Sequence, residues 1–407
     1  MIQRVVRQID QSELNAEITV ATSISQRDAV LSQLGDRVNI VTEPSRRHTF
    51  PAICLACEYL SKVKHCEPDE TIVVMPCDPF TGMEYYQAIQ SMVEGISKEK
   101  FDIILMGVSP TYPSSKYGYI LSEPFQDNRI ERVEVFKEKP SVVEAEKLIQ
   151  KGALWNAGVF AFKLGLMLGI SDTFMKYDAY AEYLENYDLY PQTSFDYEVA
   201  EKSSSMGVVT FKGEWKDLGT WNTITDELDI TQYGNVITDN SGENTHIFNE
   251  LNIPLLCIGT NNLIIAASHD GIIVSEKSKS ENVKTFAGQL KQRPMYEERR
   301  WGTYKVIDFV EFPDKFYALT KQLTLNPGSS ISYQRHSCRD EVWTFIDGEG
   351  EIVLDGVRKP VKRGDVINIP KGQLHALRAI TSLTFIEVQY GSNLVEEDIE
   401  RFPFNWD

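Results

Sequence analysis

The pattern of apolar residues changes once along the chain, and this change most limits the folds that the sequence can adopt. Up to about residue 225, short apolar runs such as TIVVMP (71–76) and FDIILMGV (101–108) alternate with amphipathic stretches such as SVVEAEKLIQKG (141–152). Alternation of predicted strands and helices indicates an α/β layered fold with a mostly parallel sheet. We therefore expect one α/β domain over residues 1–232.

The rest of the sequence consists mainly of short β-branched runs. Between residues 233 and 292 these runs are separated by Asn, Gly and Asp turns, which indicates a short β-solenoid-like connector. From 293 to 407, strands with turn signals dominate, which is typical of an all-β barrel. Three domains suit a chain of 407 residues, because one domain commonly takes about 150 residues.

Charge and hydropathy limit the partners of this protein. The formal net charge is −18, which argues against a nucleic-acid partner, since a phosphate backbone binds a basic surface. No stretch reaches the ~18 apolar residues of a membrane span, and the N-terminus lacks the apolar run of a signal peptide. We expect a cytoplasmic protein with no membrane partner. Small anionic substrates stay compatible with the charge if a divalent ion or local Lys and Arg residues neutralise them.

Four side chains in the last domain have the types and spacing of metal ligands. Gln334 and His336 lie two residues apart on a predicted strand, so they point to the same face. Glu341 follows shortly after them, and His375 comes from a second strand. Two imidazoles, one carboxylate and one amide oxygen suit a divalent first-row ion. The alternative is a vestigial site that holds its metal weakly or not at all.

These ligand positions resemble the two sequence motifs of the cupin family, and Gln-x-His is similar to the phosphomannose isomerases of that class. RRWGTYKVID (299–308) and FIEVQYGSNLVEEDIER (385–401) resemble the start and end of the isomerase domain in bifunctional guanylyltransferase/isomerases. The resemblance implies Zn²⁺ or another divalent metal on the four ligands. Two segments depart from the family, HALRA (375–379) and the tail FPFNWD (402–407), so isomerase activity stays an open expectation.

Seven ordered blocks in the first two thirds of the chain carry a second resemblance. They are EPSRRHTFPAI (43–53), VVMPCDPF (73–80), PSSKYGYI (113–120), VFKEKPS (135–141), LWNAGVFAF (154–162), SFDYEVAEK (194–202) and WKDLGTWNT (215–223). Together they resemble the sugar-phosphate nucleotidyltransferase domain of the mannose-1-phosphate guanylyltransferase family, the bifunctional type with a C-terminal cupin domain. The resemblance implies a Rossmann-like domain of the GT-A type, and synthesis of GDP-mannose from GTP and mannose 1-phosphate with Mg²⁺.

The family resemblance assigns roles to particular side chains. Asp78 follows a predicted strand, at the end where open α/β sheets bind ligands, and the resemblance makes Asp78 and Asp217 the Mg²⁺ ligands. Without the resemblance, an Asp directly after a strand would more simply be interpreted as a helix cap or a turn residue. The resemblance also implies substrate-binding residues: Arg47 on the nucleotide side, and Gly118, Glu138, Lys139 and Asn156 on the sugar-phosphate side. It gives Lys139 a catalytic role at the phosphate as well.

The family begins with a buried strand and a Gly-rich loop that holds the triphosphate through backbone N–H groups. Residue 1 of this sequence falls where the family already has the following helix. Two strands of the central sheet are therefore expected to lack one hydrogen-bonding neighbour. We expect a natural protein longer than this sequence, with a relative unable to transfer nucleotide as the alternative. The 407-residue chain itself is expected to have little transferase activity.

Two other functions stay open at this level. The barrel alone would support a phosphomannose isomerase, and the whole chain would also suit a non-catalytic sensor of sugar phosphates or nucleotide sugars. Sugar and base preference depend on pocket shape, which the sequence does not give. A homo-oligomer is compatible with the connector and the barrel, which are common places for contacts between subunits.

Overall fold

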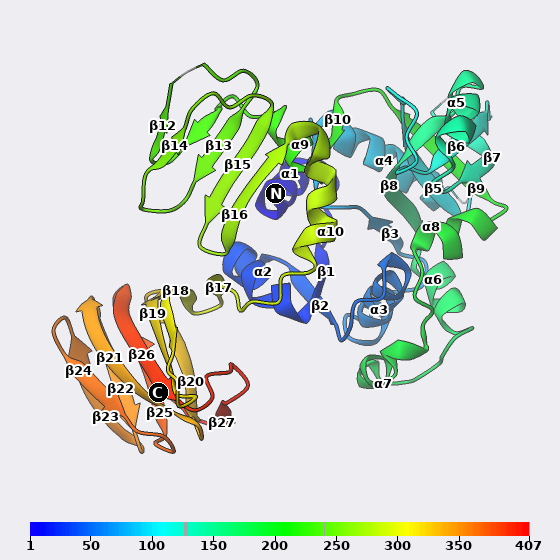
Figure 1. Cartoon of the computed structure of the whole chain (residues 1–407). Coiled ribbons are helices and arrows are strands. Elements are labelled where there is room, and N and C mark those ends of the chain that lie inside the picture. Colours follow the sequence, from blue (N-terminus) through cyan, green and yellow to red (C-terminus); the bar gives the residue numbers. More distant parts are fainter. Residues whose placement is uncertain (99, 126–128, 240, 407) are drawn as a thin grey trace. The chain divides into compact units, whose positions relative to one another are not determined.

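The computed structural model describes all residues except 99, 126–128, 240 and 407. Within this part, the chain divides into two compact units, the first formed by residues 1–27 and 34–219 and the second by residues 28–33 and 220–407 (Figure 1). The three-domain division with boundaries near 232 and 292 stays a prediction. None of the described helices is long and apolar enough to cross a membrane.

A six-stranded sheet in the order β3-β8-β5-β9-β7-β6 forms the centre of the first unit (Figure 1). Its strands are β3 (Thr71–Val74), β5 (Ile103–Val108), β6 (Tyr119–Glu123), β7 (Glu131–Lys137), β8 (Leu154–Lys163) and β9 (Met206–Phe211).

The directions of these strands correct one expectation. Only β5 and β9 pair in parallel, whereas β8 runs antiparallel to β3 and β5, and β7 runs antiparallel to β6 and β9. The expectation of a mostly parallel sheet is therefore wrong. The β6–β7 hairpin reverses the chain, and the crossover through helix α5 (Val142–Gln150) keeps the reversed direction for β8.

Helices cover both faces of this sheet, and β5 shows why its sequence is apolar throughout. Ile103 and Leu105 pack in the cluster that contains α3 (Thr49–Lys62) and α6 (Leu164–Ser171). Ile104 and Met106 pack on the other face, with α4 (Glu84–Ser97). All six residues of β5 are buried. A strand covered on both faces reads as a continuous apolar run, which is what the sequence shows.

Strands β1 (Thr19–Ser23) and β3 of the first unit each have one free edge. Strand β1 pairs with β2 (Asn39–Glu43) in a separate two-stranded sheet, and β3 pairs with β8. Among the described residues no strand lies on the other side of β1 or β3, as expected for two strands that each lack a neighbour. For this reason TIVVMP, expected to be a buried strand, is half-buried over β3.

The region after helix α9 (Trp221–Thr225) forms the expected solenoid-like connector. Short strands stack in parallel, β11 on β13 and β13 on β15 in one sheet, and β12 on β14 in another. Ile247, Cys257 and Ile265 form its small core. Its elements are β11 (Gln232–Tyr233), β12 (Val236–Thr238), β13 (His246–Asn249), β14 (Leu255–Cys257), β15 (Leu263–Ser268), β16 (Gly271–Glu276) and α10 (Val283–Ala287).

Two antiparallel sheets form the C-terminal barrel and confirm the all-β expectation (Figure 1). Their strand orders are β17-β18-β19-β26-β21-β24 and β23-β22-β25-β20-β27. Trp343, Phe345 and Phe385 are among the large side chains buried between them. The strands are β17 (Tyr296–Arg299), β18 (Gly302–Glu311), β19 (Tyr317–Leu325), β20 (Ser330–Arg335), β21 (Arg339–Asp347), β22 (Glu349–Leu354), β23 (Val357–Lys362), β24 (Val366–Ile369), β25 (His375–Ala379), β26 (Leu383–Gly391) and β27 (Glu400–Phe402).

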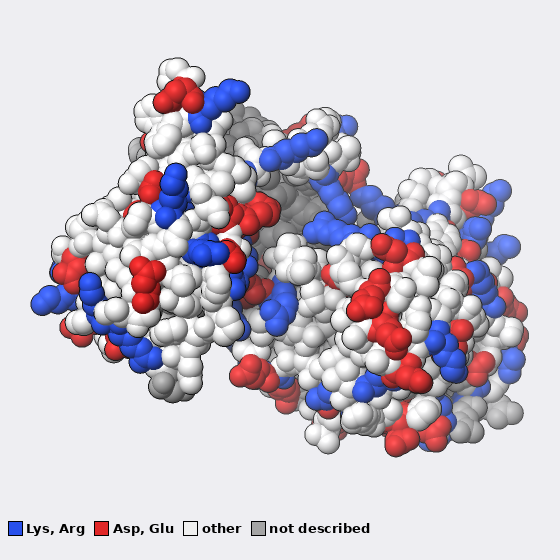
Figure 2. All heavy atoms as spheres, turned by 90° about the horizontal axis from the view of Figure 1, so that it is seen from below, with Lys and Arg blue, Asp and Glu red and all other residues white. Residues whose placement is uncertain are grey.

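The molecular surface carries both signs of charge. On the face drawn in Figure 2, Lys and Arg side chains are interspersed with Asp and Glu side chains. The excess of acidic residues in the composition is therefore spread among basic ones over this face rather than gathered in one field.

The two-sided packing of the sheet predicts where the first unit is sensitive to mutation. Leu164→Ala should lower the free energy of unfolding by about 2–5 kcal/mol, because Leu164 is fully buried and its loss leaves a cavity. Leu189→Ala is the matched control, since Leu189 is 57% exposed, and should change it by less than about 0.5 kcal/mol. Urea denaturation measures both, and equal effects would contradict the assignment of the core.

Candidate functional sites

A short antiparallel pairing brings two distant carboxylates together in the first unit. Strand β4 (Pro79–Thr81) pairs with β10 (Trp215–Asp217), with Asp217 opposite Pro79. Beside this pair, the Leu218 N–H donates to the Asp78 carbonyl oxygen at 3.4 Å. The pKa of Asp78 is raised, first by burial and then by the charge of Asp217. A cation between the two carboxylates would remove this repulsion, so the arrangement suits a metal ion.

The four residues expected on the sugar-phosphate side also lie together. Lys139 Nζ lies 2.8 Å from Glu138 Oε1, and the Asn156 N–H donates to the Gly118 carbonyl oxygen at 2.8 Å. A Cβ atom on Gly118 would lie 2.6 Å from Glu138 Oε2 and 3.2 Å from Asn156 Cβ. Only glycine leaves room for these two side chains. Glu138 and Asn156 are both buried.

A fifth polar residue in this cluster, Asp196, has no role in the sequence interpretation. It lies on helix α8 (Phe195–Glu198), and its Oδ1 accepts a hydrogen bond from Asn156 Nδ2 at 2.8 Å. After burial, its charge is the largest cause of the raised pKa of Glu138. The available signal was its place inside SFDYEVAEK, one of the seven blocks that carry the family resemblance.

Tyr117 connects the two groups of residues. Its hydroxyl donates to Asp217 Oδ2 at 3.5 Å, while its ring packs on Trp155, with 4.7 Å between ring centroids. Trp155 directly precedes Asn156, and Tyr117 directly precedes Gly118. Tyr117 thus links the paired carboxylates to the segments that carry Gly118 and Asn156.

Arg47 does not join this group in the structure. Its Nη1 donates to Asp188 Oδ1 at 2.9 Å, and Nε and Nη2 donate to the Tyr190 carbonyl oxygen at 3.2 and 3.1 Å. The guanidinium is therefore engaged by the segment that follows helix α7 (Tyr180–Glu185). A nucleotide-side role for Arg47 stays a prediction.

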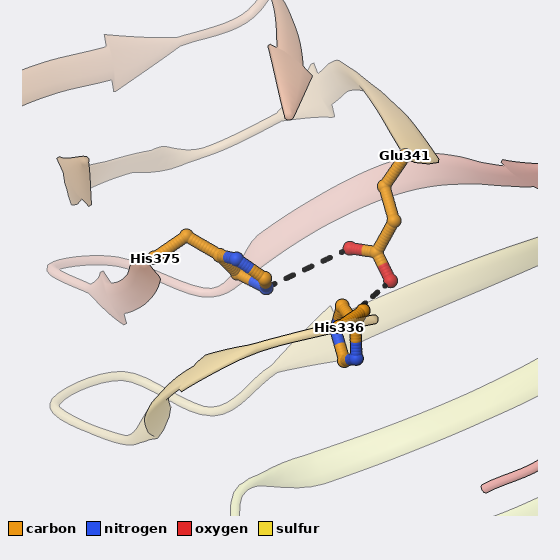
Figure 3. Close-up of side chains that lie close together, drawn as sticks. All are labelled: His336, Glu341 and His375. Atoms are coloured by element: carbon orange, nitrogen blue, oxygen red, sulfur yellow. Dashed lines mark ion pairs between the residues drawn. The ribbon is translucent and has the colours of Figure 1, made fainter. Parts of the chain in front are cut away.

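In the barrel, three predicted metal ligands point toward one another (Figure 3). His336 Nε2 lies 3.2 Å from Glu341 Oε1, and His375 Nε2 lies 3.7 Å from Glu341 Oε2. One ligand atom from each residue lies within 4.8 Å of the others, and all three side chains are buried. Gln334 is opposite His375 in the β20–β25 pairing, and its Nε2 lies 3.4 Å from His336 Nε2.

Hydrogen bonds fix the form of both imidazoles. His336 Nδ1 lies 2.5 Å from the Asp398 carbonyl oxygen, and His375 Nδ1 lies 3.0 Å from the Gln373 carbonyl oxygen. A carbonyl only accepts, so each Nδ1 carries the hydrogen and each Nε2 keeps a lone pair. Burial lowers the pKa of His336 to about 4 and also lowers that of His375, so both rings are neutral at pH 7.

This state of the imidazoles is the one that binds a metal ion. The fully buried His375 Nε2 has no hydrogen-bond partner within the described part of the chain. A buried lone pair without a partner is costly unless a ligand takes it. Two neutral imidazoles aimed at one carboxylate, beside an amide, therefore fit a divalent cation.

Several buried partners of this cluster were not predicted. Arg339 donates to Glu341 Oε1 at 3.0 Å and contacts His336 Nε2 at 3.3 Å. Trp343 Nε1 donates to Glu341 Oε2 and to Glu387 Oε1, both at 3.1 Å. The pKa of Glu387 is raised to about 7, first by burial and then by the charge of Glu341. Arg339 and Trp343 flank Glu341 at a spacing of two on β21, so a test for side chains on the same strand face would have found them.

Two family models match successive parts of the chain. Residues 1–233 match the family described as Nucleotidyl transferase, and residues 289–403 match the family described as Mannose-6-phosphate isomerase C-terminal. The first match spans more than half of the chain. The chain therefore belongs to the nucleotidyl transferase family, and it carries a C-terminal barrel of the second family.

Curated relatives match this chain over most of their length. Mannose-1-phosphate guanylyltransferase of Escherichia coli K12 is 28% identical over 404 residues, which covers 89% of this chain and 82% of that protein. Xanthan biosynthesis protein XanB of Xanthomonas campestris is 28% identical over 403 residues, with 91% and 84% covered. A crystal structure described as mannose-1-phosphate geranyltransferase from Thermus thermophilus has a TM-score of 0.52 and 26% identity, and covers 66% of this chain and 83% of that one.

The contact between the two carboxylates predicts a coupled titration. Asp217→Asn should lower the pKa of Asp78, because it removes a neighbouring negative charge. The pKa should stay above the ordinary value, since burial is the larger cause. Carboxyl ¹³C chemical shifts followed against pH measure the change. Asp102→Asn, an exposed site in the same unit, is the control and should leave the pKa of Asp78 unchanged. If Asp217→Asn also leaves the pKa of Asp78 unchanged, the contact is contradicted.

Proposed function

We propose that the protein transfers a guanylyl group from GTP to mannose 1-phosphate, which yields GDP-mannose and pyrophosphate. One observation carries this proposal: Asp78 and Asp217 lie side by side, next to the cluster of Glu138, Lys139 and Asn156. Membership of the nucleotidyl transferase family and relatives named for this reaction support it. Because both substrates are cytoplasmic metabolites, we place the reaction in the cytoplasm.

The reaction joins two polyanions. A phosphate oxygen of the sugar phosphate attacks the α-phosphorus of GTP, a new P–O bond forms, and the bond to the β-phosphate oxygen breaks as pyrophosphate leaves with the electron pair. Positioning and charge neutralisation supply most of the catalysis in such transfers. Asp78 and Asp217 would hold Mg²⁺, which supplies positive charge for the phosphates.

Side chains of the sugar-phosphate cluster orient the attacking substrate. Lys139 provides a positive charge for the phosphate, and its pairing with Glu138 limits where the ammonium can lie. The Asn156 amide is fixed at both ends, since Nδ2 donates to Asp196 and Oδ1 accepts from the Gly158 N–H at 3.0 Å. Its second amide hydrogen stays available for a sugar hydroxyl. Preorganised groups of this kind cost no reorganisation during the reaction.

The carboxylate pair should be essential for transfer. Relative to the unsubstituted chain, and even where its own rate is low, Asp78→Asn and Asp217→Asn should each lower the rate of pyrophosphate release from GTP and mannose 1-phosphate by on the order of 10²–10³, as for loss of one electrostatic group in other enzymes. A coupled phosphate assay with Mg²⁺ measures the rate. Asp102→Asn, the exposed control, should retain the wild-type rate. Transfer that survives both substitutions would exclude the proposed site.

We propose a second activity for the barrel, the interconversion of fructose 6-phosphate and mannose 6-phosphate. The convergence of Gln334, His336, Glu341 and His375 with both imidazoles neutral favours it, as does the family match over 289–403. One proton leaves C1 of the ketose and one is added at C2, while the hydroxyl proton on O1 is lost and O2 gains a proton, so no second substrate is needed. The four side chains would hold Zn²⁺ or another divalent ion, which polarises the carbonyl and alkoxide oxygens.

The two activities should separate by mutation. Gln334→Ala should lower formation of mannose 6-phosphate at least about tenfold, because it removes one ligand, and should leave pyrophosphate release unchanged. Asp78→Asn should lower pyrophosphate release and leave formation of mannose 6-phosphate unchanged. Both assays on both variants form a crossed experiment. Loss of both activities in either variant would contradict two independent sites.

A further inference from the structure

The segment just before the last strand of the barrel lies against the loop that carries a predicted metal ligand. Asp398 makes three contacts with consecutive residues of this loop. Its carbonyl oxygen accepts from His336 Nδ1 at 2.5 Å, its Oδ1 accepts from the Ser337 N–H at 3.0 Å, and its Oδ2 accepts from the Cys338 N–H at 3.0 Å. One residue therefore holds the loop by both carboxylate oxygens and the imidazole by its backbone.

The loop needs such support because of where it lies. Strand β20 ends at Arg335 and β21 begins at Arg339, so His336 follows the end of the strand, and its backbone carbonyl oxygen accepts a hydrogen bond from the Gly372 N–H at 2.7 Å. Gln334, Glu341 and His375 lie on strands, where pairing fixes their backbone. Of the four predicted ligands, His336 depends most on contacts from outside its own strand.

The segment that carries Asp398 is itself fixed on its N-terminal side. Arg339 Nη1 donates to the Val395 carbonyl oxygen at 3.0 Å, and Lys321 Nζ lies 2.6 Å from Glu396 Oε1. Arg339 and Lys321 are both buried. Two buried cations therefore anchor the chain just ahead of Asp398.

On its C-terminal side the segment continues into β27. This strand pairs with β20, with Gln334 opposite Arg401 and Arg335 opposite Glu400. Arg335 Nε also donates to Glu400 Oε2 at 2.6 Å. Asp398 is thus held from both directions, which lets it act as a rigid support for the loop.

We infer that Asp398 is a positioning residue of the metal centre in the barrel. It keeps His336 in the tautomer that carries hydrogen on Nδ1, so that the Nε2 lone pair is presented to the metal, and it holds the 336–338 loop in place. It does not itself coordinate. The inference rests on the proposed metal site, and it extends that site by a residue from the C-terminal segment. Mutation of partners of this kind typically costs about 10–100-fold in metal affinity.

The test uses the full chain, freed of metal, and measures Zn²⁺ affinity by competition with a chromophoric chelator. Asp398→Ala should weaken Zn²⁺ binding by about 10–100-fold. Asp398→Asn should weaken it less, because the Asn side-chain oxygen still accepts one of the two amide bonds. Glu397→Ala removes the same charge from the adjacent exposed residue and should leave the affinity unchanged.

A second readout does not depend on metal. Imidazole ¹⁵N shifts of the metal-free protein report the tautomer, and the His336 signals are assigned among the six histidines by their loss in His336→Gln. Wild type should show Nδ1 protonated alone. Asp398→Ala keeps the backbone carbonyl at position 398 but loses the carboxylate that holds the 336–338 loop against it, so the bond to Nδ1 should loosen and a mixture of tautomers should appear. Glu397→Ala should match wild type.

The outcomes separate the inference from the proposals on which it rests. Unchanged affinity and tautomer in Asp398→Ala would overturn the positioning role, even if the melting temperature falls, because a purely structural role lowers stability alone. Wild-type protein that binds no Zn²⁺ would overturn the metal centre and this inference with it, while pyrophosphate release would still report on the transferase. Zn²⁺ binding without isomerase activity would remove the second activity and leave the positioning role supported if affinity falls in Asp398→Ala.

Discussion

The pairing of β4 with β10 is the contact on which the proposed transferase site depends. Each strand has only three residues, yet their register places Asp217 beside the end of the segment that carries Asp78. The charge of Asp217 raises the pKa of Asp78, second to the effect of partial burial, so the two carboxylates repel each other. The fold tolerates this cost because the surrounding sheet and helices, with cores on both faces, hold the two segments in place.

The candidate metal centre in the barrel depends on neutral side chains rather than on paired charges. It needs imidazoles that stay neutral, and burial achieves this by lowering the pKa of His336 and of His375. Backbone carbonyl oxygens that accept hydrogen bonds from Nδ1 then determine that Nδ1, and not Nε2, carries the hydrogen. The two centres are therefore prepared in different ways, one by bringing two carboxylates together and the other by burying two imidazoles in their neutral form.

The sequence was most informative where chemistry and local pattern coincide. Gln334 and His336 were predicted to lie on one strand; the strand ends at Arg335, so His336 lies just beyond it, yet the structure still brings both residues close to Glu341 and His375. It was less informative about strand direction, because the reversal made by the β6–β7 hairpin leaves no mark on the apolar pattern of β8. Asp196 and Asp398 escaped notice for a related reason. Their importance comes from hydrogen bonds to residues far away in the sequence, which no local spacing reveals.

The free edges of β1 and β3 affect how the protein behaves at high concentration. Each edge carries a row of backbone N–H and C=O groups that pair with no neighbouring strand among the described residues. Such rows pair readily with any extended peptide, including the same edge of another molecule. Self-association through these edges would not require unfolding. The tendency of this protein to associate can therefore differ from its stability against unfolding.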